Sequence, residues 1–498
     1  MSVNNKYILD FLTNAKEKGI TVFLENGKLK YTLDEKKPLD KEVLAGLKNL
    51  KSDLLEFFNS NAEDFNLIKT GFNKIIPADR SKISKLPLTF SQERLWFLDR
   101  MDGSIHYHLP AILRLKGKLN EEALEDSLKN IIKRHEVLRT VIREENGEGY
   151  QVINEVDRWN LQHIDGSKYN DDPEKLKNYV RELMDIPFNL SEDYMMRAHL
   201  INLSDDVNVL ILTMHHIASD GWSTSILVKE LVEFYKSFEE GREAVLPPLQ
   251  IQYSDFALWQ KDNIQGEVLK KKLDYWYRKL DDVEPLHLQE DFNRPAVQSS
   301  KGAIKGFSID NELKDSLQTL AQKNGATLFM ILLAAFNVLL SKYSGQNDIC
   351  VGSPIAGRQL EELEDLIGFF VNTLAMRSDV RNEDTFIEFL QQVRTTTLEA
   401  YEHQEVPFEK IVDSVIKQRD MSRSPLFQVT FVLQNTPDVP ELRLGELSLF
   451  NEDYNYNISK YDFTFFMFES SQGLQGDVEY CTDLYKEETI VRMISHFK

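Results

Sequence analysis

The chain has few cysteines and no long apolar run. These two features exclude several classes of protein, namely disulfide-rich, CxxC zinc-binding and membrane-spanning proteins. Its 498 residues contain only two cysteines, Cys350 and Cys481, which are far apart in the sequence. Two distant thiols exclude a disulfide framework and a CxxC zinc site, and they fit a reducing compartment. No segment is long and apolar enough to span a bilayer, and residues 1–16 carry no signal-peptide pattern. We therefore expect no metal site, no membrane contact and a cytoplasmic location.

Positive charge is also scarce. Lys and Arg number 59 against 80 Asp and Glu, which gives a formal net charge of −21. A chain this acidic repels a phosphate backbone, so nucleic acid is not an expected partner. Several catalytic signatures are missing as well: there is no GxGxxG or Walker sequence, and Ser219 lies outside any GxSxG elbow. Cys350 lies beside an apolar strand-like run, where a buried and inert thiol is the usual outcome.

The first sixty residues form a pattern of their own. Residues 7–18 and 40–58 place apolar side chains at helical spacing, and between them the runs ITVFLE and KLKYTL flank Asn26-Gly27. Asn-Gly between two strand-like runs is a strong hairpin signal, because both central residues of the turn need positive φ. We predict a small domain of helix, β-hairpin and helix over residues 1–59. Residues 60–86 are mixed in character and are interpreted as a connector.

From residue 87 onward, strand-like runs alternate with helical runs. In the first half, strands are predicted at 112–117, 197–203 and 208–216 and helices at 120–133 and 223–238. In the second half, strands are predicted at 303–309, 348–354, 428–434, 463–469 and 476–481 and helices at 311–323 and 328–343. We predict an α/β fold of two similar lobes, residues 87–264 and 265–498. Lys498 ends a helix-like run, which leaves open both a natural terminus and a cut from a longer chain.

One segment combines a buried strand with polar side chains at its end. His215 and His216 close an apolar run, and Asp220 and Gly221 lead into the next predicted helix. Adjacent strand residues point to opposite faces, so the two imidazoles cannot easily hold one metal ion, and no third ligand stands at a fitting spacing. One ring is expected to face a cavity and the other to pack inside. A histidine beside an apolar strand is more often a satisfied core residue, so this pattern alone leaves catalysis open.

A series of further motifs favours catalysis. HHIASDG at 215–221 resembles the HHxxxDG signature of nonribosomal peptide synthetase condensation domains, which have a chloramphenicol-acetyltransferase-like fold. Other segments resemble the family's motifs in the family's order: FSQERLWFL (90–98), RHEVLRT (134–140), YSDFALWQ (253–260), IGFFVNTL (367–374), HQEVPFE (403–409) and RDMSRSPLFQ (419–428). Glu93 departs from the usual residue of the first motif. The resemblance extends from residue 87 to residue 434.

The resemblance implies a reaction and a set of site residues. Two lobes in a V around a central tunnel would join a donor thioester to an acceptor amine, both carried on phosphopantetheine arms of carrier proteins, and the chain itself would bind no cofactor. His216 would stand at the reaction centre, either as the base or as the group that positions the amine. Asp220 would pair with Arg358 of the second half as a scaffold. The Gly221 N–H would stabilise the oxyanion, and His215 would be structural.

The N-terminal unit resembles the tubulysin-type docking domains found at the start of synthetase subunits. The resemblance rests on its length, element order and position. It implies capture of a C-terminal docking peptide from an upstream subunit, where Lys28, Lys30, Lys36 and Lys37 could hold an acidic partner. The sequence has no adenylation-domain motif and no carrier-domain serine. We expect those domains downstream on the full-length chain, in the biosynthesis of an antibiotic or another secondary metabolite.

Two other functions stay open. Epimerization domains share HHxxxDG, but the intact QERLWFL, HQEVPFE and RSPLFQ segments and the N-terminal unit favour condensation. A family member that has lost catalysis and only recruits a partner protein is disfavoured by the intact His216 and Asp220. The segment DGWS at 220–223 is compatible with L-donor and D-donor subclasses and with dual epimerization and condensation, and we favour an L-donor type.

Overall fold

A computed structural model describes a two-stranded N-terminal hairpin and most of the chain from residue 74. The described residues are 20–25, 28–33, 47, 50, 74–170, 172–417, 420–434, 444–451 and 458–498. Strand β1 (Ile20–Glu25) pairs antiparallel with β2 (Lys28–Leu33), which confirms the strands of the predicted hairpin. The predicted helix at 7–18, most of that at 40–58, the Asn26-Gly27 turn, Lys36 and Lys37 lie outside the described residues.

The first lobe is built on a five-stranded sheet with the order β14-β4-β9-β8-β7. Its strands are β4 (His108–Lys116), β7 (Gln162–Asp165), β8 (Met196–Ser204), β9 (Val207–His215) and β14 (Ser448–Asn451). Alternate residues of β9 enter two cores, Leu210 and Leu212 on one face and Val209 and Ile211 on the other. Helices α6 (Glu121–Arg134) and α8 (Gly221–Glu240) cover the first face, and α7 (Pro173–Met184) covers the second.

A second, three-stranded sheet adds to this lobe and begins within the predicted connector. It has the order β3-β6-β5, with β3 (Leu86–Pro87), β5 (Thr140–Glu145) and β6 (Glu148–Ile153), and helix α5 (Phe90–Asp102) follows β3. The last part of residues 60–86, interpreted above as a connector, lies against this lobe. Ile75 is 2% exposed in the first lobe's core, and the Ala78 N–H donates to Asp255 at 3.0 Å. The buried Ile75 side chain and the hydrogen bond of Ala78 hold this segment on the lobe. The segment has no helix or strand periodicity in its sequence that would indicate this contact.

The second lobe has a six-stranded sheet with the order β10-β16-β15-β13-β11-β12. Its strands are β10 (Gly302–Ile309), β11 (Asp348–Ile355), β12 (Asn372–Asp379), β13 (Val429–Gln434), β15 (Phe463–Ser470) and β16 (Gly473–Cys481). Its helices are α10 (Gly266–Leu280), α11 (Asn311–Lys323), α12 (Leu328–Ser344), α13 (Phe386–Glu402), α14 (Phe408–Val415) and α15 (Glu487–Phe497). The apolar helix α12 and the phenylalanines of β13 and β15 form one large core.

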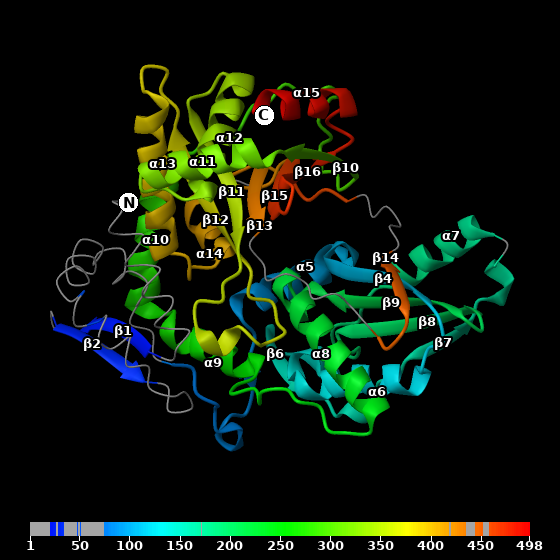
Figure 1. The fold of residues 1–498 in the computed structure, drawn as a ribbon. Coiled ribbons are helices and arrows are strands. Elements are labelled where there is room, and N and C mark those ends of the chain that lie inside the picture. Colours follow the sequence, from blue (N-terminus) through cyan, green and yellow to red (C-terminus); the bar gives the residue numbers. More distant parts are fainter. Residues whose placement is uncertain are drawn as a thin grey trace.

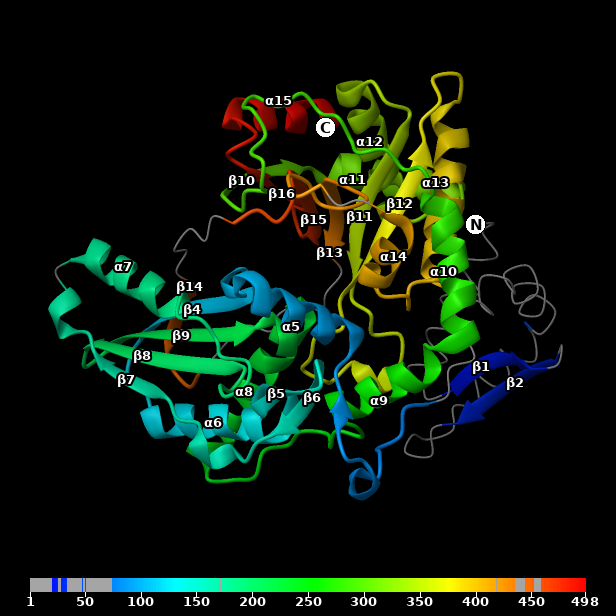
Figure 2. The same cartoon turned by 180° about the vertical axis from the view of Figure 1, so that it is seen from behind.

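The two lobes meet at one end and diverge toward the other, as Figures 1 and 2 show. Helix α9 (Tyr253–Asn263) and the loop between β11 and β12 lie at the closed end. Between α5 of the first lobe and α14 of the second lies a cavity of about 510 Å³, lined by Phe90 and Arg94 on one side and Phe408 and Glu409 on the other. The predicted two-lobed α/β fold is therefore confirmed.

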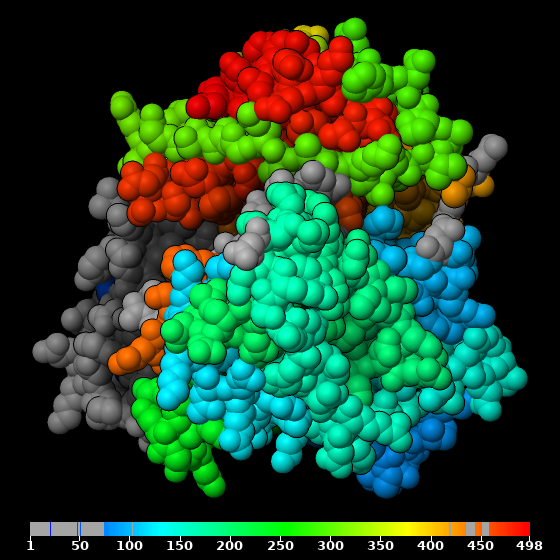
Figure 3. All heavy atoms as spheres, turned by 90° about the vertical axis from the view of Figure 1, so that its right-hand side faces the viewer, coloured from blue at the N-terminus to red at the C-terminus, as the bar shows by residue number. Residues whose placement is uncertain are grey.

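Strand β14 modifies the predicted division of the lobes at residue 264. That division falls between α9 and α10, yet β14 comes from the second half and pairs antiparallel with β4, with Ser448 opposite Lys116. In Figure 3 its orange atoms lie against the cyan surface of the first lobe. The edge of β4 offers unpaired backbone groups, which a short strand can satisfy. The second half of the chain thus completes the first lobe's sheet.

Within the part of the chain that the structure describes, no single helix is long and apolar enough to cross a membrane. Only α11 and α12 pass that test as a pair, and they are bent by 103° relative to each other. In the same residues, no group of three His, Cys, Asp or Glu side chains is arranged to hold a metal ion.

Candidate active site

The HHIASDG segment forms the turn between the central strand β9 and helix α8. Every residue of β9 after Val207 is buried, because both faces of the sheet are covered. The strand ends at His215, and a 3₁₀ turn, η6 (His216–Ala218), directs the chain toward α8. Asp220 is the N-cap of α8, and its carboxylate accepts from the Ser223 N–H at 2.9 Å. Strand, turn and cap together fix the positions of both histidines.

His215 is packed inside the first lobe. Its side chain is fully buried, its Nε2 lies 2.8 Å from Ser104 Oγ, and its Nδ1 accepts from the Ile217 N–H at 3.1 Å. Its ring also contacts the rings of His108 and Phe188. Burial lowers the pKa of His215 to about 3, so the ring is neutral at neutral pH. Both nitrogens are occupied, and these contacts suit a structural residue.

His216 points away from that core and toward the second lobe. Its side chain is half-buried, and its ring centre lies 4.6 Å from that of Phe369, in the loop between β11 and β12. Its Nδ1 atom is buried. Burial, followed by the positive charge of Lys460, lowers the pKa of His216 to about 4. The structure therefore places a neutral imidazole where the two lobes meet.

Asp220 and Arg358 form an ion pair across the lobe boundary. Arg358 Nη2 lies 3.1 Å from Asp220 Oδ1, and their side chains are 1% and 0% exposed. The second carboxylate oxygen of Asp220 accepts from the Phe370 N–H at 3.1 Å. Arg358 Nη1 donates to the Leu366 carbonyl at 2.7 Å, and its guanidinium lies 4.1 Å from the centre of the Phe370 ring. The structure thus joins these two sequence-predicted residues, which bind the β11–β12 loop to the start of α8.

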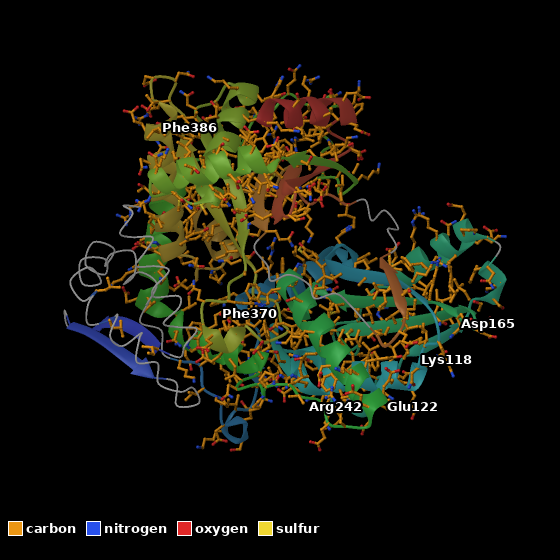
Figure 4. All side chains as sticks on the ribbon, in the orientation of Figure 1. Lys118, Glu122, Asp165, Arg242, Phe370 and Phe386 are labelled. Carbon is orange, nitrogen blue, oxygen red and sulfur yellow. The ribbon has the colours of Figure 1, made fainter. Side chains whose placement is uncertain are left out.

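Three more hydrogen bonds hold the same loop on the first lobe. Ser223 Oγ accepts from the Gly368 N–H at 3.1 Å, and the Tyr253 hydroxyl donates to the Phe369 carbonyl at 2.7 Å. His135 Nδ1 accepts from the Ile367 N–H at 3.3 Å. Figure 4 shows Phe370 where the two lobes meet. The loop that carries Phe369 is therefore fixed, and with it one wall beside His216.

Gly221 is the first residue of α8, and its surroundings leave space. A Cβ built on it would meet no atom within 4 Å. Among the described residues, none accepts a hydrogen bond from its N–H, whereas the Ser223 N–H is already used by Asp220. The N-terminus of a helix favours negative charge. An oxygen anion placed in this open space would find an unused donor.

The remaining candidate residues lie elsewhere. Lys28 and Lys30 belong to β2 of the N-terminal hairpin, and Lys36 and Lys37 lie outside the described residues. Cys350 is buried in β11, and burial raises the pKa of its thiol to about 12, which suits an inert core residue.

Sequence reasoning missed several side chains that lie between the lobes. Arg94 of α5 forms an ion pair with Glu409 of α14, 2.7 Å apart. The Lys460 ammonium lies 4.9 Å from the centre of the Tyr107 ring. Both contacts join different lobes. Arg94 and Glu409 lie inside the motifs at 90–98 and 403–409, and that position could have marked them as site candidates. Lys460 and Tyr107 lie in no motif, so the sequence offered no sign of their contact.

Comparison with known proteins gives two family matches. The family model for the condensation domain matches residues 82–498, and that for the TubC N-terminal docking domain matches residues 8–59. One of the linear gramicidin synthase subunits of Brevibacillus parabrevis is 46% identical over 428 residues, which cover 85% of this chain and 6% of that protein. Bacitracin synthase 2 of Bacillus licheniformis is 36% identical over 495 residues, which cover 98% of this chain and 18% of that protein. The chain thus spans a small part of these relatives.

Solved structures share the fold. The X-domain from teicoplanin biosynthesis superimposes with a TM-score of 0.76 at 26% identity, covering 85% of this chain and 95% of that one. The first condensation domain of the CDA synthetase gives a TM-score of 0.66 at 18% identity, covering 83% and 96%. The two-lobed architecture is common to all three.

Proposed function

The chain belongs to the condensation-domain family of nonribosomal peptide synthetases, and from that premise we propose that His216 marks the centre at which its peptide bond forms. The family's reaction is amide formation between two carrier-bound substrates. We propose that the donor aminoacyl or peptidyl thioester and the acceptor amino acid enter on phosphopantetheine arms. The acceptor amine attacks the donor carbonyl, the new C–N bond forms, and the pantetheine sulfur leaves as a thiol.

The observation that carries this proposal is the position of His216, whose half-buried ring follows the end of β9 and lies with its centre 4.6 Å from that of Phe369 in the β11–β12 loop. A ring with a pKa of about 4 is neutral at neutral pH, so it can accept a hydrogen bond from an amine N–H. The same low pKa makes the ring a weak base, so it is poorly suited to take up the proton that the amine loses. Orientation of the nucleophile is therefore the role of His216 that we favour over general base catalysis.

The start of α8 supplies the second element of the mechanism. The tetrahedral intermediate carries a negative oxygen, and the unused Gly221 N–H at the helix N-terminus is a suitable donor. Asp220 does not face the substrate in this scheme. Its carboxylate is occupied by Ser223, Arg358 and the Phe370 N–H, so it holds Gly221 and the opposite loop in place.

The docking domain implies interaction with an upstream subunit. We propose in finer detail that a C-terminal peptide of that subunit pairs with an edge of the β1–β2 hairpin. A two-stranded sheet has open edges, and Lys28, Lys30, Lys36 and Lys37 would attract an acidic peptide. We also propose that an adenylation and a carrier domain follow on the full-length chain and present the acceptor.

A condensation assay with His216→Ala tests the proposal. Loaded donor and acceptor carriers are mixed with the full chain, and dipeptidyl carrier is quantified by mass spectrometry. We expect near-complete loss of product, with an unchanged melting temperature. His163→Ala, at an exposed position on the first lobe, is the matched control and should retain activity. Product within about twofold of the unmodified chain would rule out both roles of His216. Chiral analysis of the product separates condensation from epimerization.

A further inference from the structure

Glu230 is a buried carboxylate on α8 that has no part in the mechanism above. Its side chain is only 4% exposed. One carboxylate oxygen, Oε1, accepts from Arg134 Nε at 2.7 Å, and the other, Oε2, lies 2.9 Å from Nε2 of His135. A buried carboxylate is costly unless it is paired, and the Arg134 guanidinium pairs it. The second contact joins the carboxylate to an imidazole ring that is itself only 1% exposed.

The other ring nitrogen of His135 determines the direction of that contact. Its Nδ1 lies 3.3 Å from the backbone nitrogen of Ile367. A backbone N–H can only donate, so Nδ1 must carry a lone pair and no proton. The ring proton is then on Nε2, which donates it to the Glu230 carboxylate. The geometry thus defines a neutral His135 ring in the Nε2–H tautomer.

The backbone of His135 is held where α6 ends. His135 is the C-cap of this helix. The side chain of Gln252, before α9, binds the residues on either side. Its Nε2 donates to the Arg134 carbonyl at 3.0 Å, and its Oε1 accepts from the Glu136 N–H at 3.1 Å. The ring therefore extends from a fixed point, and its tautomer depends on the groups that face its two nitrogens.

Ile367 belongs to the part of the β11–β12 loop that borders His216. Phe369, two residues later, has its ring centre 4.6 Å from that of His216. Three backbone N–H groups of this loop donate to side chains of the first lobe: Ile367 to His135, Gly368 to Ser223 and Phe370 to Asp220. A hydroxyl group and a carboxylate always offer a lone pair, whereas an imidazole accepts only through an unprotonated nitrogen. Of these three attachments, the one to His135 therefore depends on a tautomer.

Helix α8 carries all the residues that act on this loop from its own side. Asp220 is its N-cap, and Ser223 and Glu230 stand seven residues apart, about two helical turns, so they lie on one face. Asp220 and Ser223 bind the loop directly, and Glu230 acts on it through His135. The helix also follows directly on the turn that carries His216. One helix thus fixes both His216 and the loop that faces it.

We propose that Glu230 is a positioning residue of the condensation site, which holds His135 in the Nε2–H tautomer so that its Nδ1 binds the Ile367 N–H of the loop that carries Phe369. The proposal rests on the function proposed for His216. In the other tautomer, an Nδ1–H group would face the Ile367 N–H, and two donors would meet. The loop would lose this attachment, and Phe369 would be held less closely beside His216.

Glu230→Gln should reverse the tautomer of His135. Glutamine has the shape of glutamate but offers an oxygen and an NH₂ group in place of two acceptor oxygens. Because hydrogen bonds to a charged group are the stronger ones, the oxygen should stay with the Arg134 guanidinium, and the NH₂ group should face His135. The Nε2 atom must then accept, and the ring proton moves to Nδ1. Adding Arg134→Met frees the oxygen for His135, so the double variant should regain the Nε2–H tautomer.

The tautomer is measured by NMR on the full chain labelled with ¹⁵N-histidine, since protonated and unprotonated ring nitrogens differ widely in ¹⁵N chemical shift. The His135 signals are assigned by their loss in His135→Asn. We expect an Nε2–H ring in the unmodified chain and an Nδ1–H ring in Glu230→Gln. Glu233→Gln is the control, because this carboxylate of α8 pairs with Arg242 at 2.6 Å, and it should leave the ring unchanged. An Nδ1–H ring in the unmodified chain, or an unchanged tautomer in Glu230→Gln, would overturn the proposal.

Condensation kinetics of the same variants test the connection to the site. We expect kcat of Glu230→Gln to fall about tenfold and to recover when Arg134→Met is added. KM for both carriers should stay unchanged, because Glu230 and His135 are buried and out of their reach. A reversed tautomer with an unchanged kcat would also overturn the proposal, since the Ile367 attachment would then not be needed. A fully active His216→Ala would instead contradict the proposed function, while the NMR result would still decide whether Glu230 sets the ring.

Discussion

Arg358 Nη2 lies 3.1 Å from Asp220 Oδ1, and this buried ion pair connects two residues that are 138 positions apart in the chain. Asp220 caps the helix that follows the two histidines, and Arg358 begins the loop that carries Phe369 and Phe370. Burial lowers the pKa of the Arg358 guanidinium, although Asp220 acts to raise it. The pair therefore couples the geometry of the candidate site to the contact between the lobes.

Removing either partner should destabilise the chain strongly. In Asp220→Ala the Arg358 guanidinium stays buried without a counter-ion, and in Arg358→Ala the Asp220 carboxylate does. The loss of one member of a buried pair costs about 3–5 kcal/mol. Denaturant unfolding should show a loss of this size for both variants. The double variant should lose less than the sum of the two, because neither charge is then left alone.

Asp348→Ala is the matched control for that experiment. Asp348 and Arg377 also form a pair at 2.7 Å, but their side chains are 38% and 23% exposed. Solvent screens such a pair, so the expected loss is at most about 1 kcal/mol. Losses of unfolding free energy of similar size in Asp220→Ala and Asp348→Ala would show that the buried pair between the lobes stabilises the chain no more than an exposed pair does.

Tyr253→Phe should slow condensation while the fold survives. The hydroxyl group of Tyr253 is buried, donates to the Phe369 carbonyl at 2.7 Å and lies 3.0 Å from Thr89 Oγ1. Without it, a buried carbonyl next to the His216 wall loses its partner, at a cost of about 1–3 kcal/mol. Unfolding and condensation rates are both measured, with the exposed Tyr277→Phe as control. If Tyr253→Phe were destabilised but condensed at the rate of the unmodified chain, the hydrogen bond from Tyr253 to the Phe369 carbonyl would not be needed for condensation.

The sequence was sufficient to predict the main elements because their patterns are local. The run NVLILTMHH predicted a buried strand that ends near the histidines, and β9 ends at His215. Asn-Gly predicted the β1–β2 hairpin in the same way. Strand β14 and the attachment of Ile75 were not predictable. Each depends on a complementary surface elsewhere in the fold, which four residues or one side chain do not reveal.

The candidate site was predictable to a smaller extent. Motif resemblance implied the Asp220–Arg358 pair, and the structure places the two side chains in contact. No motif pointed to Lys460, since a lysine before a strand is usually a solvated residue. Its contact with Tyr107 depends on how the lobes meet, and spacing along one chain does not encode a relation between two lobes.

Acid should destabilise the chain in part through His199, on β8. His199 is 7% exposed, and burial, assisted by the charge of Arg197, lowers its pKa to about 4. Above pH 6.5 the ring is neutral in both the folded and the unfolded chain. Between about pH 6.5 and pH 4 the unfolded chain binds a proton that the folded chain does not, so the free energy of unfolding decreases as the pH falls.

The His199→Gln variant isolates this contribution. Each such histidine removes about 1.4 kcal/mol of stability per pH unit inside that window. The unmodified chain should therefore lose stability more steeply than His199→Gln, by about this amount per unit between pH 6 and pH 5. Denaturant unfolding at several pH values gives both slopes, and other titrating groups cancel in the comparison. Equal slopes would mean that the folded chain protonates His199 as readily as the unfolded chain does.

Deletion of residues 1–59 should impair transfer only when the upstream subunit is dilute. The family model for the docking domain matches residues 8–59, and the first lobe includes the chain from Ile75 onward, so this deletion leaves the lobe's core complete. With donor carrier in excess, collision alone supplies the substrate, and the truncated chain should condense as fast as the full chain. With the native upstream subunit at low concentration, the full chain should be faster, because docking raises the effective concentration of the donor.

Charge reversal on the hairpin tests the same docking without a deletion. Lys28→Glu with Lys30→Glu should weaken capture of an acidic peptide and reduce its dependence on salt, since charges at the rim of an interface act chiefly on association. Lys129→Glu with Lys133→Glu, on α6 of the first lobe, changes the net charge by the same amount at a distant surface and should leave transfer unchanged. Equal losses in both double variants would point to the overall charge of the chain. No loss in the hairpin variant, with impaired transfer after deletion, would assign docking to other residues of the N-terminal domain.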